Sequence, residues 1–76
     1  MTDAFDDLAA KVLDLIEQRK EHHRAGGQTT QFDYVELHEA FDVLAIKYCG
    51  LSTNDRNQCR MQLLKVASAF HHFLLM

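Results

Sequence analysis

The chain has 76 residues, enough for one small domain. Hydrophobic residues make up 47% of it, which excludes a disordered acidic tail, because such tails are poor in apolar residues. Its formal net charge of −3 gives no general attraction for phosphate backbones, and its two cysteines are too few for a disulfide scaffold.

Residues 1–76 are expected to form a single helical domain. Gly26-Gly27 and Gly50 divide the sequence into three segments, and no proline interrupts any of them. Each segment has apolar residues at helical spacing, which predicts helices over about 3–25, 31–49 and 53–75.

The first predicted helix has one apolar stripe, formed by Phe5, Leu8, Val12, Leu15 and Ile16. After Ile16 the sequence becomes polar. We therefore expect the last two turns of this helix to project beyond the core or to fray. Gly26 is the expected left-handed stop.

The second and third predicted helices begin with similar caps, Thr30 followed by Asp33 and Ser52 followed by Asp55. The second helix has a core stripe of Tyr34, Leu37, Phe41, Leu44, Ala45 and Tyr48. The stripe of the third consists of Cys59, Leu63, Val66, Ala67, Phe70, Phe73 and Leu74. The sequence thus predicts an all-α fold, either a small three-helix bundle or a helical hairpin plus an arm, completed by homodimerisation. A core this small supplies only about 3–5 kcal/mol, so association is the expected further source of stability.

A second set of apolar residues lies away from these stripes. At 100° per residue, Val35, Val43 and Ile46 fall on the opposite side of the second helix. Met61, Leu64 and Leu75 lie away from the stripe of the third helix in the same way. One interpretation is that the second helix is the most buried one. We favour the other, that part of this set faces outward and forms an interface.

Charge is also unevenly distributed. Residues 28–50 carry four acidic side chains and one lysine, whereas residues 51–76 carry one aspartate and three basic side chains. The two segments can pair within the fold, or the acidic one can attract a basic partner.

No histidine or cysteine pattern predicts catalysis or a cofactor. His38-Glu39-Ala40-Phe41-Asp42 resembles H-E-x-x-H, but Asp42 replaces the second histidine and no third ligand is evident. The adjacent histidines at 22–23 and 71–72 point about 100° apart on a helix, so neither pair chelates a metal by itself. Cys49 and Cys59 match no zinc or redox spacing. We expect a protein that is not an enzyme and has no metal or cofactor.

The alternative function is DNA binding. The second helix, the Cys49–Ser52 turn and the third helix resemble a helix-turn-helix in outline, and Arg56 and Arg60 suit phosphate or base contacts. However, Arg56 stands where a helix-turn-helix places an aliphatic residue, and the acidic second helix would repel phosphates. A nucleic-acid partner is therefore not expected.

The sequence favours a small protein-binding regulator that occupies a surface of a protein partner. In size, acidity and lack of catalytic motifs it is similar in type to small helical inhibitors, anti-activators and adaptors among phage and bacterial accessory proteins. The expected partner-binding residues are Val35, Glu36, Glu39, Asp42, Val43, Ile46, Tyr48, Arg56, Arg60 and Leu64.

A homodimer is expected to bury the apolar C-terminal residues, which water would otherwise face. These are Phe70, Phe73, Leu74, Leu75 and Met76. No membrane span is expected, because the longest apolar run is much shorter than the about 20 residues needed. With no signal peptide recognisable at residues 1–7, we expect a cytoplasmic protein.

Overall fold

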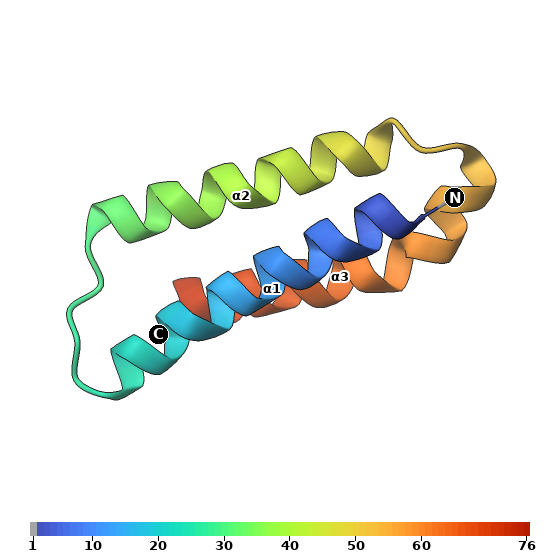
Figure 1. The fold of residues 1–76 in the computed structure, drawn as a ribbon. Helices are drawn as coiled ribbons and strands as arrows, with labels where there is room; N and C mark the ends of the chain where they lie inside the picture. Colours follow the sequence, from blue (N-terminus) through green and yellow to red (C-terminus); the bar gives the residue numbers. More distant parts are fainter. Residues whose placement is uncertain (1) are drawn as a thin grey trace.

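The computed structural model describes residues 2–76, which form three helices. These are α1 (Asp3–Arg24), α2 (Gln31–Cys49) and α3 (Thr53–Leu74). The helix boundaries agree with the predicted ones to within one residue. All three pairs of helices are in contact, so the chain is a three-helix bundle rather than a hairpin with a detached arm (Figure 1).

The helices lie side by side along a rod of 42 × 18 × 17 Å. At 1.5 Å per residue, helices of this length span about 30 Å, so they fit only along the long axis. The chain reverses direction at each connection, so that α2 runs antiparallel to both α1 and α3 (Figure 1).

Local hydrogen bonds set the ends of the helices. Gly26 has φ +91, and its N–H donates to the His23 carbonyl, while the Gly27 N–H donates to the His22 carbonyl. This pair of bonds is the Schellman arrangement that ends a helix. At the start of α2, the Asp33 N–H donates to Thr30 Oγ1 and the Thr30 N–H donates to Asp33 Oδ2, which completes the predicted capping box.

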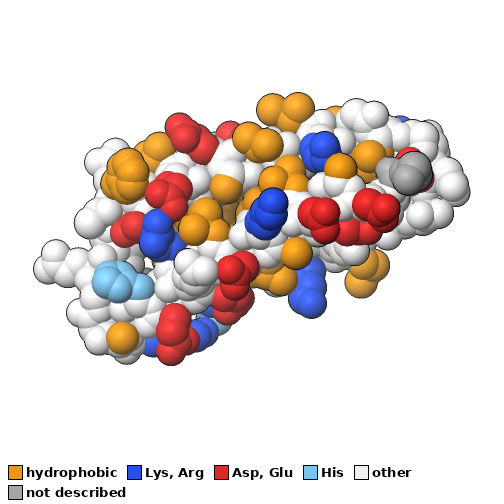
Figure 2. Space-filling view, viewed as in Figure 1, with side chains coloured by type: hydrophobic (Ala, Val, Ile, Leu, Met, Phe, Trp, Pro, Cys, Tyr) orange, Lys and Arg blue, Asp and Glu red, His pale blue; other side chains and the backbone are white. Residues whose placement is uncertain are grey.

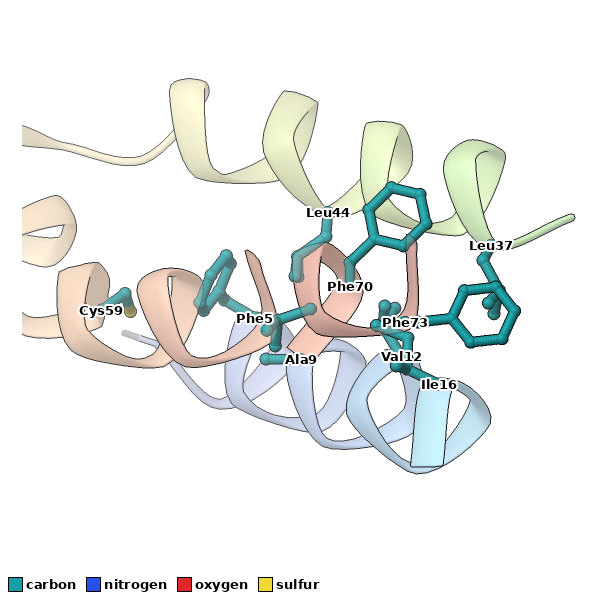
Figure 3. Close-up of a cluster of buried hydrophobic side chains, with 10 residues drawn as sticks. Phe5, Ala9, Val12, Ile16, Leu37, Leu44, Cys59, Phe70 and Phe73 are labelled. Carbon is teal, nitrogen blue, oxygen red and sulfur yellow. The ribbon is translucent and has the colours of Figure 1, made fainter. Parts of the chain in front are cut away.

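The core lies between the three helices and is built mainly from the predicted stripes (Figure 3). The prediction was wrong for Leu74, which is 49% exposed, and it missed Ala9, which is buried. Ring contacts join the helices: Tyr34 packs on Phe73 with centroids 5.3 Å apart, and Phe5 packs on Tyr48 at 5.9 Å. The buried core residues are Phe5, Ala9, Val12, Ile16, Leu37, Leu44, Cys59, Val66, Phe70 and Phe73.

The end of α1 differs from the prediction. α1 stays helical to Arg24 instead of fraying, and most residues of its last turn are exposed. The turn before it packs on the bundle: Lys20 is only 6% exposed, with Nζ 3.5 Å from Glu17 Oε1, and Arg19 forms ion pairs with α2. For this turn the prediction was wrong, because long basic side chains bury their aliphatic stems while their charged ends keep acidic partners.

Candidate functional site

The exposed large apolar side chains lie on two of the three helices or directly after them. Among residues 2–76, none of them lies on α1, so the outer side of α1 is polar and those of α2 and α3 are not. They are Phe32, Val35, Val43 and Ile46 on α2, Met61, Leu64 and Leu74 on α3, and Leu75 directly after α3. Exposed apolar side chains that share the outer face of a helix in a small domain are typical of an interaction surface.

Four of these side chains share one face of α2, in two pairs separated by a single residue. Phe32 is 70% exposed, Val35 47%, Val43 56% and Ile46 73%. Their positions fall within about 80° of one another on the helix, on the side opposite the buried Leu37 and Leu44. We call these four residues, with Glu39 between them, the α2 outer face. Figure 2 shows hydrophobic side chains along α2 with acidic side chains beside them.

The predicted exposure of Val35, Val43 and Ile46 is therefore confirmed, and the alternative that α2 is covered on all sides is wrong. Sequence reasoning missed Phe32. The signal was present, because Phe32 precedes Val43 by 11 residues, which is close to three full turns.

The acidic residues of α2 differ in their partners. Glu36 Oε1 accepts a hydrogen bond from Arg19 Nη2 at 2.6 Å, and Asp42 Oδ2 lies 3.1 Å from His38 Nδ1. Glu39 is exposed, and within residues 2–76 its carboxylate has no ion pair or side-chain hydrogen bond. Of these three carboxylates, Glu39 is the one that makes no contact with a charged or hydrogen-bonding side chain of residues 2–76.

A groove of about 610 Å³ lies between α2 and α3, beside the α2 outer face. It joins residues predicted for two different roles, since Val35, Glu39 and Asp42 were expected to bind a partner and Phe70 and Leu74 to form a dimer. The groove is lined by Gln31, Tyr34, Val35, His38, Glu39, Asp42, Phe70 and Leu74. An apolar floor with an acidic rim suits a side chain that is both apolar and basic.

The remaining predicted partner-binding residues lie apart from the α2 outer face. Tyr48 is half-buried against Phe5, and its hydroxyl donates to the Arg56 carbonyl at 3.2 Å. Arg56 Nη1 donates to the Cys49 carbonyl at 3.4 Å, so Arg56 helps to close the turn between α2 and α3. Arg60 and Leu64 are exposed on α3.

The predicted dimer residues divide into two groups. Phe70 and Phe73 lie in the core of the single chain, with Phe73 only 1% exposed. Leu74 and Leu75 are exposed beyond that core, and Met76 is half-buried against it. Of the five predicted dimer residues, the last three therefore offer surface to a second copy.

The pair of α2 and α3 does not have helix-turn-helix geometry. In that motif the two helices cross at about 90–120°, so that the second can enter the major groove. Here α2 and α3 lie antiparallel along their length (Figure 1). Arg56 also donates hydrogen bonds within the turn between the two helices, to the Cys49 carbonyl and to the Thr53 hydroxyl.

The histidines and cysteines of the described chain form no metal-binding cluster. Within residues 2–76, no three His, Cys, Asp or Glu side chains gather to hold a metal ion. Cys49 and Cys59 are both free thiols, the first exposed and the second buried. Burial raises the pKa of the Cys59 thiol, which keeps it protonated and unreactive.

None of the three described helices is long and apolar enough to cross a membrane. No protein-family model, curated protein or solved structure matches the chain.

Proposed function

We propose that the protein is a small cytoplasmic regulator, not an enzyme, that acts by occupying a surface of a protein partner through the α2 outer face. The observation that carries this proposal is the exposure of Phe32, Val35, Val43 and Ile46 on a bundle whose own core is already closed. These side chains are not needed to complete the fold, and a partner that covers them removes apolar surface from water.

The composition of the patch supports protein rather than nucleic acid as the partner. Four apolar side chains make up most of it, Glu39 lies between them, and Glu36 and Asp42 lie beside them. Carboxylates repel phosphates, whereas apolar side chains combined with a few charged ones are typical of protein interfaces.

A comparison of two double variants tests the proposal. Val43→Asp with Ile46→Asp places two charges in the patch, and Ala10→Asp with Gln18→Asp places two on the exposed side of α1. In capture from native extract, we expect the first variant to lose the partner and the second to keep it, with both retaining wild-type circular dichroism. Equal capture by both variants, or gel retention of random duplex DNA at low salt, would contradict the proposal.

The proposal also includes self-association through the residues at the end of α3. Leu74 and Leu75 are exposed next to the core residues Phe70 and Phe73, so a second copy could cover them. We expect light scattering at tens of micromolar to give twice the chain mass of 8.8 kDa. Leu74→Lys with Leu75→Lys should restore the single-chain mass. A wild-type mass near 8.8 kDa would refute the dimer without affecting partner binding.

A further inference from the structure

Glu39 occupies the centre of the α2 outer face. Val35 and Val43 lie four residues before and after it, and Phe32 and Ile46 lie seven residues before and after it. Positions four and seven residues away are one and two turns along the same side of a helix. An exposed carboxylate is thus surrounded by the four most prominent apolar side chains of α2.

A partner that covers these four side chains must also cover Glu39. Removing a charged group from water is costly unless an opposite charge meets it. Within residues 2–76 no basic side chain pairs with Glu39: Arg19 is held by Glu36 and Asp33, and His38 lies against Asp42. The cation that meets Glu39 therefore has to come from the partner.

A second copy of this chain does not fit the α2 outer face. Two α2 helices facing each other about a twofold axis would bring together Glu39 and the neighbouring carboxylates of both copies. The outer side of α3 is basic, but Ser68 and His71 separate its apolar residues Met61 and Leu64 from Leu75. Its apolar side chains are therefore not spaced like the four around Glu39.

The dimensions of the patch point to a single helix as the occupant. Phe32 to Ile46 spans four turns, about 21 Å along α2. Two helices pack through residues repeated at spacings of three and four, the spacing found here. A polar residue within such a seam fixes the register of the two helices.

We propose that the α2 outer face binds one amphipathic helix of a partner protein, about four turns long, with an arginine or lysine in its apolar stripe opposite Glu39. The proposal rests on the proposed function and names the class of partner. Apolar contacts provide the attraction, and the Glu39 ion pair selects basic over acidic helices and sets the register.

Selection from a display library of random peptides, about 18 residues long, against the full chain tests the proposal. We expect the selected peptides to have an apolar stripe at helical spacing with a basic residue near its middle. Fluorescence anisotropy should then show that Glu39→Lys weakens binding by about tenfold or more, with a smaller loss for Glu39→Gln.

Asp14→Lys is the matched control, because Asp14 is an exposed carboxylate on the outer side of α1. It makes the same charge change, and it should leave the affinity within about twofold. Replacing the central basic residue of the peptide by glutamate should restore binding to Glu39→Lys and reduce binding to the wild type. That exchange identifies the pair directly.

The results separate this inference from the proposed function. Peptides that lose binding to Val43→Asp with Ile46→Asp, but have no basic centre and bind Glu39→Lys normally, overturn the inference and leave the proposed function intact. No selected peptide at all, or peptides that bind both sets of variants normally, overturn both. A doubled mass in light scattering that Val43→Asp with Ile46→Asp abolishes would identify a second copy as the occupant and overturn the inference.

Discussion

Arg19 Nη2 donates to Glu36 Oε1 at 2.6 Å and thereby joins the end of α1 to the first turns of α2. The Nε atom of the same guanidinium lies 3.3 Å from Asp33 Oδ1 as an ion pair, without the alignment of a hydrogen bond. One arginine thus contacts two acidic residues on adjacent turns of α2. These contacts hold together the two ends of a loop that spans residues 25–30, and they keep the polar turns of α1 on the bundle.

Replacement of Arg19 by methionine should lower the free energy of unfolding by about 1 kcal/mol. The substitution keeps most of the apolar stem and removes both ion pairs, which are about one-third exposed and therefore partly screened by solvent. Urea denaturation followed by circular dichroism measures the change. Arg24→Met is the control, because the Arg24–Glu21 pair is much more exposed and should contribute less than about 0.5 kcal/mol. Equal effects of the two variants would contradict this role for Arg19.

Asp33 should make the stability depend on pH in the acid range. The Thr30 N–H, followed by the Thr30 hydroxyl and Arg19, holds the pKa of this carboxyl below its ordinary value of 3.8, against an opposing effect of desolvation. A carboxyl whose pKa is lower in the folded state stabilises the fold fully above pH 3.8, and this contribution is lost as the pH falls through the folded-state pKa. We expect wild type to be more stable than Asp33→Asn at neutral pH. Denaturant unfolding across the acid range should show the difference shrinking only below about pH 4. A difference that grows on acidification would contradict the assignment.

Gly26 and Gly50 both follow helices and should respond oppositely to alanine. Gly26 has φ +91, where a side chain is strained, so Gly26→Ala should cost about 1 kcal/mol although nothing lies near the added methyl group. Gly50 has φ −81, and an added methyl group would meet the Lys47 carbonyl at an ordinary 3.6 Å. Gly50→Ala should therefore stabilise the protein by about 0.5 kcal/mol through the unfolded state. Thermal melting of the two variants checks both signs.

The parts of the fold that depend on neighbouring residues were predictable from the sequence. The apolar stripes, the Thr30 and Ser52 caps and the stop at Gly26 each arise within a few residues. The caps and the stop are confirmed, and so are the stripes apart from Leu74, which is exposed. The position of Arg19 and Lys20 was not predictable in this way. Their burial depends on which side of α1 faces α2, and a polar run looks the same whether it is solvated or paired across the bundle.

The same reasoning explains what was found and missed in the candidate site. The sequence has apolar residues on two opposite sides of α2, which is more apolar surface than one core can cover. This indicated that Val35, Val43 and Ile46 are exposed, as the structure shows. The sequence could not show that Glu39 lacks a partner, since Glu36 and Asp42 appeared equivalent to it until their contacts with Arg19 and His38 were seen. In the C-terminal apolar run, helical spacing correctly placed Phe70 and Phe73 in the core and Leu75 outside it, but it also placed the exposed Leu74 in the core.

Phe73→Ala and Leu75→Ala should separate the two groups within that run. Phe73 is almost fully buried and packs on Tyr34, so truncation should cost about 3–5 kcal/mol, comparable with the stability of a domain this small. We expect far-ultraviolet circular dichroism to show a largely unfolded Phe73→Ala chain. Leu75 is 72% exposed, and Leu75→Ala should change the stability of the monomer by less than about 0.5 kcal/mol at micromolar concentration. Similar losses for both would place Leu75 in the core.

The two thiols should differ in their reaction with a disulfide reagent because they differ in burial. Cys49 is exposed at the end of α2, whereas Cys59 is 1% exposed in the core and burial raises its pKa. Since the thiolate is the reactive form, Cys49 should react at once and Cys59 only when the bundle opens. Cys49→Ser should abolish the fast phase, and Cys59→Ser should leave it unchanged. In denaturant both thiols should react rapidly. A fast phase from both thiols in the native protein would contradict this prediction. It would mean that the first turns of α3 open readily, although contacts of Tyr48 and Arg56 close the turn between α2 and α3.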